Sequence, residues 1–203
     1  MLRTPRSDVP TEGAGAASAE GAEVQLIRRI ARGEPRAFDQ LYRAYHPRLT
    51  RFIDRLTRQP GLVGELLNDT MFVVWTHAAR YNGQSKVSTW IFAIAYRKAL
   101  KAMGRRDEPM EAAQEDDAEE PASGPEQLLM HTELRAALSR ALGDLSAEQR
   151  AVVDLSYRHG IGYREIADIV GCPAETVKTR MFHARRRLRS LLAGQPTMSA
   201  ISR

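Results

Sequence analysis

The sequence of 203 residues contains a single cysteine, Cys172, and only 6% aromatic residues. One cysteine excludes an internal disulfide bond and any metal site built from several thiolates. The five histidines stand singly, and neither a glycine-rich phosphate loop nor a G-x-S-x-G nucleophile turn is present. We therefore expect no metal, no cofactor and no catalytic residue, and a protein that is not an enzyme.

Long hydrophobic runs are also missing. No run approaches the roughly 18 residues that span a bilayer, and the mean hydropathy is -0.41. Arg3 and Arg6 are followed by Gly, Ala, Ser and Glu in place of a hydrophobic stretch, so no signal peptide is recognisable. We expect a folded chain that makes no membrane contact and stays in the cytoplasm.

Charge is distributed in blocks. Residues 24–106 carry 16 basic and 5 acidic side chains, whereas residues 107–126 carry 9 acidic and no basic ones. Residues 127–193 are basic again, with 11 basic and 7 acidic side chains. Two cationic blocks separated by an anionic one favour a nucleic acid as partner, although basic residues that only solvate helices would give the same counts.

Helical spacing of hydrophobic residues dominates both basic blocks. Residues 1–22 contain almost no large hydrophobic side chain, so we expect a disordered tail there. Residues 107–126 combine three prolines with the acidic run and predict an extended linker. In the first block we expect one helix that begins at Val24 and a second that begins at Pro35 and is kinked or divided at Pro47. Two more helices are expected over residues 62–79 and 87–103.

The second block predicts a helix-turn-helix. The sequence Ser146 to Gln149 has the pattern of a capping box, which starts a helix. A short helix over residues 163–170, a turn at residues 171–173 and a long helix over residues 174–192 follow. Two helices joined by a tight glycine turn are typical of DNA-binding modules.

The last helix has one hydrophobic stripe and otherwise basic faces. Its first turns present side chains that can contact base edges, and its later arginines suit phosphates. The alternative is a surface helix with a solvated basic face, but the preceding helix and turn favour DNA binding. The candidate residues for base contacts are Thr176, Lys178, Thr179, Phe182 and His183.

The segment from Tyr81 to Ala95 places a polar loop before an aromatic-rich helix that then turns basic. It resembles region 2 of the bacterial extracytoplasmic-function (group 4) sigma factors of the sigma-70 family, and Leu145 to Leu192 resembles their region 4. The resemblance implies an all-α fold of two helical domains: region 2 over residues 23–106 and region 4 over residues 127–193. The acidic linker of residues 107–126 joins them, and tails of residues 1–22 and 194–203 flank them.

By this resemblance the chain is an alternative sigma factor. It would bind core RNA polymerase, direct it to promoters with −35 and −10 elements, and help to melt the −10 element. In the family, the helix at residues 62–79 docks on the clamp helices of the largest polymerase subunit. The corresponding residues here are Glu65, Asn68, Asp69 and Phe72, with Leu62 where an acidic residue is usual.

The resemblance also assigns the promoter contacts, to single-stranded DNA at −10 and to duplex DNA at −35. Melting requires a base that has left the stack, and the polar loop would hold it. The implied −10 contacts are His77, Tyr81, Asn82, Gln84, Ser85, Lys86, Arg97 and Lys101. Arg97 stands at a position where many members of the family have Asn. The implied −35 contacts are Lys178, Thr179, Phe182 and His183, with Arg180, Arg185 and Arg186 nearer the backbone.

Two further hypotheses concern regulation and packing. Because the docking helix has lost one acidic residue, phosphorylation of Thr57 or Thr70 by a regulatory kinase would add charge for a basic partner. An anti-sigma factor is the other candidate regulator. Trp75 and Trp90 lie within hydrophobic stripes and are expected to pack in the core.

Two alternatives remain open at this point. The first is a regulator with a helix-turn-helix of the LuxR type behind a helical sensor domain, which acts without docking on polymerase. The second is a helical interaction protein without a role on DNA. The loop from Tyr81 to Lys86 has no purpose in the first of these alternatives, whereas the sigma factor interpretation gives it one.

Overall fold

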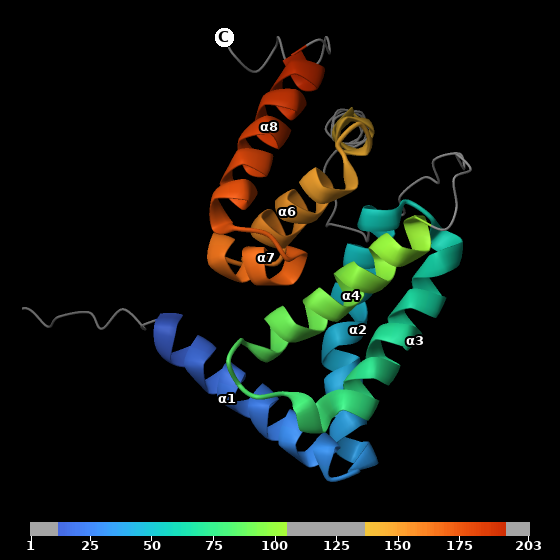
Figure 1. Ribbon diagram of the computed structural model, residues 1–203, viewed down its shortest axis with the longest axis vertical. Helices are drawn as coiled ribbons and strands as arrows, with labels where there is room; N and C mark the ends of the chain where they lie inside the picture. The colour runs from blue at the N-terminus through green and yellow to red at the C-terminus, as the bar shows by residue number, and fades with distance from the viewer. Residues whose placement is uncertain (1–11, 105–136, 194–203) are drawn as a thin grey trace, which may run out of the picture.

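The computed structural model describes residues 12–104 and 137–193 (Figure 1). Every regular element within these two ranges is a helix, which confirms the expected all-α fold. No helix in them is both long and hydrophobic enough to cross a membrane. The helices are α1 (Glu12–Ala31), α2 (Pro35–Thr57), α3 (Pro60–His77), η1 (Ala78–Arg80), α4 (Val87–Met103), α6 (Ala147–Tyr157), α7 (Tyr163–Val170) and α8 (Ala174–Ala193), with a helical stretch at residues 137–143 before α6.

Helix α1 begins earlier than the sequence pattern indicated. The prediction of a disordered tail is wrong for residues 12–22, which are helical. This stretch contains five alanines, the strongest helix formers, and continues directly into the hydrophobic turns after Val24. Residues 1–11, the expected linker at 107–126 and the tail at 194–203 lie outside the described residues.

Helix α2 supplies the centre of the first unit. Pro35 occupies its first turn, and the helix continues through Pro47, so the division considered for this position does not occur. It ends at Thr57, and the capping residue Arg58 adopts a left-handed conformation with φ 54°. Its fully buried side chains recur at helical spacing and are Leu41, Tyr45, Leu49, Phe52, Ile53 and Leu56.

Aromatic contacts tie α1, α3 and α4 to this helix. The rings of Phe52 and Phe92 meet edge to face with centroids 5.2 Å apart. The Tyr45 hydroxyl donates a hydrogen bond of 2.8 Å to Glu23 of α1, and burial raises the pKa of this phenol far above its ordinary value. Trp75 and Trp90 are partly buried against the same core, as predicted.

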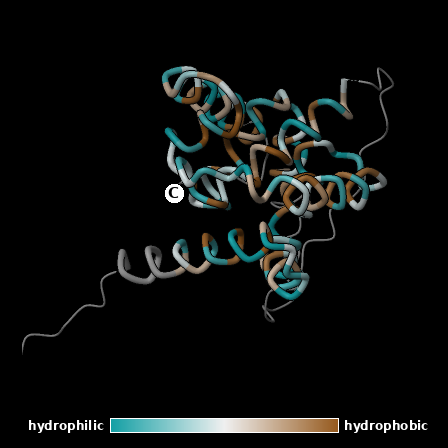
Figure 2. The backbone as a smooth tube through the Cα atoms, turned by 60° about the horizontal axis from the view of Figure 1, so that its bottom comes forward, coloured by the Kyte–Doolittle hydropathy of each residue, from teal (hydrophilic) through white to brown (hydrophobic). Residues whose placement is uncertain are grey.

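The second unit is the expected helix-turn-helix. Ser146 and Gln149 form the predicted capping box at the start of α6. Between α7 and α8, Gly171 has φ 68°, a left-handed conformation that glycine adopts without strain. Figure 2 shows hydrophobic residues recurring from turn to turn along the packed helices, with hydrophilic residues between them.

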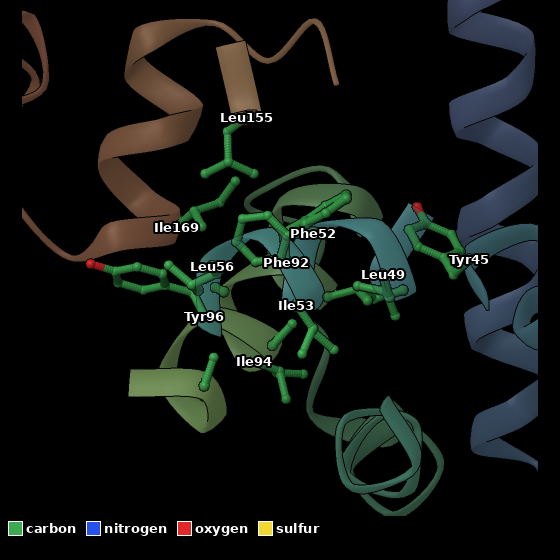
Figure 3. Close-up of a cluster of buried hydrophobic side chains, with 14 of the residues drawn as sticks. Tyr45, Leu49, Phe52, Ile53, Leu56, Phe92, Ile94, Tyr96, Leu155 and Ile169 are labelled. Atoms are coloured by element: carbon green, nitrogen blue, oxygen red, sulfur yellow. The ribbon is translucent and has the colours of Figure 1, made fainter. Parts of the chain in front are cut away.

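The two units share one hydrophobic core. Helix α7 packs on α4, and α6 packs on α2. Figure 3 shows Leu155 of α6 and Ile169 of α7 pointing toward Phe92 and Tyr96 of α4. The sequence predicted two units but not this packing of one against the other.

Candidate nucleic-acid interface

The outer face of α8 collects the four residues to which the family resemblance assigns base contacts. The helix is oriented by Val177, Met181 and Ala184, which are buried. Phe182 is 63% exposed, and its ring touches that of His183 with centroids 5.5 Å apart. Lys178 forms an ion pair of 2.7 Å with Glu175 one turn earlier.

The phosphate-contact candidates on α8 divide into two groups. Arg186 is exposed. Arg180 donates to the Cys172 sulfur over 3.7 Å, which directs it to the turn rather than outward. Arg185 donates to the Tyr157 hydroxyl at 2.9 Å and lies over that ring, so it is fixed against α6.

The loop after η1 is held in a defined shape. The Tyr81 hydroxyl donates to the carbonyl oxygen of Ser85, and the Tyr81 ring packs against Trp90 with centroids 5.4 Å apart. The Asn82 side-chain oxygen accepts from the Gln84 backbone N–H at 3.1 Å, which closes a local turn. The side chains of Asn82 and Gln84 remain exposed at its tip.

The remaining −10 candidates flank this loop. His77 closes α3, where its Nδ1 lies 2.9 Å from the Thr76 hydroxyl. Arg97 and Lys101 are exposed and one turn apart on α4. The structure therefore brings His77 and the loop together near the start of α4 and places Arg97 and Lys101 further along that helix.

Lys86 is engaged by the second unit. Its Nζ lies 2.6 Å from Glu165 Oε1 on α7, and this hydrogen bond raises the pKa of Lys86 above its ordinary value. Helix α7 thus lies against one residue of the proposed −10 surface. This contact was not foreseen, because Glu165 lies in the other basic block.

The polymerase candidates share one face of α3. Glu65, Asn68, Asp69 and Phe72 follow the spacing of neighbouring turns, and Phe72 is 65% exposed. Asp69 pairs with Lys98 of α4 at 2.7 Å. An exposed aromatic ring beside carboxylates and an amide is a surface suited to a protein partner with basic groups.

Comparisons with known proteins agree with this geometry. A sigma-70 region 2 model matches residues 41–108, and a sigma-70 region 4 model matches residues 135–188. The extracytoplasmic-function RNA polymerase sigma-E factor of Escherichia coli is 29% identical over 170 residues, which cover 79% of this chain and 88% of that protein. The chain belongs to the extracytoplasmic-function sigma factors of the sigma-70 family.

Other relatives are similar over comparable lengths. The RNA polymerase sigma-H factor of Pseudomonas aeruginosa is 28% identical over 171 residues, which cover 79% of this sigma factor and 89% of that one. The solved sigma factor RpoE of Bartonella quintana, in complex with the anti-sigma factor NepR, is 25% identical with a TM-score of 0.63. That match covers 78% of this chain and 98% of that one.

The comparisons do not support the LuxR-type alternative. The region 2 match occupies the unit that this alternative needed as a sensor domain. A helical interaction protein without a DNA role is disfavoured in the same way, since both matched regions are those of a transcription factor. The polymerase-dependent function is therefore the one retained.

The structure gives a reason for Leu62 in this sigma factor. Its side chain is 8% exposed and belongs to the hydrophobic core. A carboxylate at this position would be largely removed from water, at considerable cost. Leu62 therefore contributes packing at a position where family members commonly carry charge.

Burial of both threonines argues against the phosphorylation hypothesis. Thr57 is 5% exposed and Thr70 is 0% exposed. Each hydroxyl donates to a carbonyl one turn earlier in its helix, that of Ile53 at 2.9 Å and that of Leu66 at 2.7 Å. A kinase could not reach either hydroxyl without unfolding the turn that holds it.

The contacts between the two units involve residues that sequence reasoning missed. Arg55 Nη1 of α2 lies 3.3 Å from Asp154 Oδ1 of α6, and the two side chains are 11% and 8% exposed. His159 Nε2 lies 3.2 Å from the other oxygen of Asp154, and its ring packs at a tilt against Phe92 with centroids 4.6 Å apart. No local sequence pattern marks the ion pair between Arg55 and Asp154, because the two residues are 99 positions apart.

Proposed function

We propose that this sigma factor docks on core RNA polymerase through the outer face of α3 and reads a promoter with two separate surfaces. In this proposal, α8 contacts the duplex of the −35 element. The loop of residues 81–86 holds one unstacked base of the single-stranded −10 element. The family accounts for the activity, and the exposed side chains support the choice of residues.

The observation that carries the −35 assignment is the exposure of Phe182 beside Lys178, Thr179 and His183. A phenyl ring that is 63% exposed has little to stabilise it within the folded chain. Contact with a thymine methyl in the major groove would bury it, and complete burial of such a side chain contributes about 1.5–3 kcal/mol. The adjacent ammonium, hydroxyl and imidazole groups supply hydrogen bonds to base edges.

The loop supports the −10 assignment through its rigidity. Tyr81 is fixed by its own hydroxyl and by Trp90, so the ring is preorganised as one wall of a base pocket. The exposed amides of Asn82 and Gln84 offer both donors and acceptors to a Watson–Crick edge that melting has freed. Lys86 supplies a positive charge for the adjoining phosphate.

This arrangement requires the two units to separate before they bind a promoter. While Lys86 is bonded to Glu165, the carboxylate competes with a phosphate for its ammonium group. The −35 and −10 elements are also separate stretches of DNA, so simultaneous contact with both needs α7 to leave α4. We infer that docking on polymerase competes with the packed arrangement and favours separation.

A protein regulator is part of the proposal. The Bartonella sigma factor was solved with an anti-sigma factor, and a partner of that kind is a candidate regulator here. Thr57 and Thr70, at which a regulatory kinase was expected to act, are both buried, which favours a protein partner over phosphorylation as the mode of control.

Substitution of Phe182 tests the residue assignment. A promoter is first selected from a randomised library by transcription with core polymerase and this sigma factor. Phe182→Ala should then lower −35-dependent transcription by about tenfold or more, while core binding is unchanged. Arg36→Ala, which removes an exposed charge at the start of α2, serves as the control. Equal activity of the two variants would refute the assignment.

A further inference from the structure

A cavity of about 410 Å³ lies where the end of α2 meets residues 137–143, α6 and α8. Its walls are hydrophobic and come from Leu138, Leu142, Val153 and Leu188. Among the described residues that line it, six are arginines and only Asp154 carries a carboxylate. Of these arginines only Arg185 is among the promoter-contact candidates, so the promoter contacts and the α3 surface leave the other five guanidinium groups around this hydrophobic space unexplained.

Asp154 does not compensate all of these charges. It lies 3.3 Å from Arg55 and 3.7 Å from Arg158. Arg150 instead donates to two neutral acceptors, the carbonyls of Gly143 at 3.1 Å and Leu56 at 3.3 Å. Positive charge therefore accumulates at one side of the cavity.

Arg58 adds to this accumulation. Its guanidinium group lies directly against Gly143, at a distance that a β-carbon on that residue would not permit. Burial, and after it the charge of Arg58, holds the pKa of Arg150 below its ordinary value. Two guanidinium groups in one small region repel each other, and a bound anion would relieve that repulsion.

We propose that this cavity binds a small amphipathic anion. Its hydrophobic body would lie against the leucine and valine walls, and its anionic head would accept hydrogen bonds from Arg58 and Arg150. The volume lies within the usual range for small-molecule sites, about 300–1,000 Å³. Medium-chain carboxylates and alkyl phosphates share the required chemistry.

The position of the cavity gives the ligand a consequence for the fold. Arg58 caps α2 in the first unit, whereas Arg150 and Leu188 belong to the second. A molecule that contacts both sides stabilises their packing against each other, since it binds only when they are together. The ligand would thereby favour the arrangement in which Lys86 is bonded to Glu165.

Isothermal titration of the full chain with decanoate tests the proposal, and it requires no polymerase. Decanol, which lacks the charge, and inorganic phosphate, which lacks the hydrophobic body, are the comparison ligands. We expect saturable binding of one decanoate, with both comparison ligands weaker by at least about tenfold. Equal binding of phosphate and decanoate, or no binding of decanoate, would overturn the proposal.

Two variants locate the site. Arg58→Asn removes the charge and introduces a residue that tolerates the left-handed backbone at φ 54°. Arg189→Gln removes an exposed lining charge on α8. Arg58→Asn should weaken decanoate binding by about tenfold, because a charged hydrogen bond is lost, and Arg189→Gln should weaken it less, because only a nearby positive charge is lost. Exposed Arg51→Gln on α2 should leave binding unchanged. Unchanged binding in both lining variants would refute the site.

The acidic segment of the same chain provides the last comparison. A synthetic peptide of residues 107–126 carries nine acidic side chains but Met110 as its only large hydrophobic one. The proposal predicts that this peptide displaces decanoate poorly. Tighter binding of the peptide than of decanoate would assign the cavity to the acidic segment instead and overturn the small-ligand proposal.

Discussion

The ion pair between Arg55 and Asp154 offers the sharpest test of the packed arrangement. Arg55→Met removes the guanidinium group from α2 and keeps an unbranched hydrophobic side chain in its place. Asp154 then retains Arg158 at 3.7 Å and His159 at 3.2 Å, both from its own unit, so the second unit should still fold. The substitution therefore acts chiefly on the contact between units.

The size of the effect follows from the burial of the pair. Removing one partner of a fully buried ion pair costs about 3–5 kcal/mol. Because Asp154 keeps two neighbours, we expect the packed state to lose only about 2 kcal/mol of stability relative to the separated state. This lowers the equilibrium constant for packing roughly thirtyfold. Binding of single-stranded −10 DNA should improve by up to the same factor if the packed state predominates.

Energy transfer between two dyes measures this equilibrium. Cysteines introduced at the exposed positions Gln40 of α2 and Ser190 of α8 carry the dyes, in a Cys172→Ser background. Arg55→Met should lower the transfer efficiency, and Arg51→Met, at an exposed position one turn earlier, should not. Equal efficiencies in the two variants would refute the idea that this ion pair holds the units together.

Three further predictions follow from other contacts. Tyr81→Phe loses the hydrogen bond to the Ser85 carbonyl and should slow strand opening, measured by permanganate footprinting, while duplex −35 binding is retained; equal opening rates would contradict the preorganised loop. Ser146→Ala removes the capping box and should lower the free energy of unfolding by about 1 kcal/mol in urea titrations, whereas an unchanged midpoint would show that the cap contributes nothing. The Ser146 hydroxyl lowers the pKa of Glu148, so its contribution is present above the ordinary pKa of glutamate and is lost as the pH falls below it. The difference in stability between wild type and Ser146→Ala should therefore shrink in acid, and a difference that grows there would contradict this sign.

Local signals in the sequence predicted most of the helices. The bounds of α4 and α7 are those expected from residues 87–103 and 163–170, because polar loops and glycines flank clear hydrophobic periods. The capping box at Ser146 was equally local. The start of α1 was missed because the absence of large hydrophobic residues outweighed the high helix propensity of alanine.

Burial of the two threonines was within reach of the sequence. Thr70 lies in the same hydrophobic stripe as Leu66, Leu67, Met71 and Val74, and that spacing already indicates an inward position. A threonine hydroxyl can be buried in such a stripe because it donates to the carbonyl one turn before it.

The packing between units was out of reach. Arg55 and Asp154 lie on helices whose own patterns are complete without each other, and their contact depends on how two folded surfaces fit. The same holds for Lys86 and Glu165, and for the arginines around the cavity. Residue types at exposed positions such as Phe182 could be chosen as functional from sequence, but their surroundings required the structure.

Run-off transcription with purified core RNA polymerase tests the central claim most directly. The full-length chain, added to core enzyme over a promoter library, should produce transcripts from a subset of templates that share two separated sequence elements. Core enzyme alone should produce none of them. If the chain binds core polymerase but yields no promoter-specific transcript, or if it does not bind core polymerase at all, the account is contradicted.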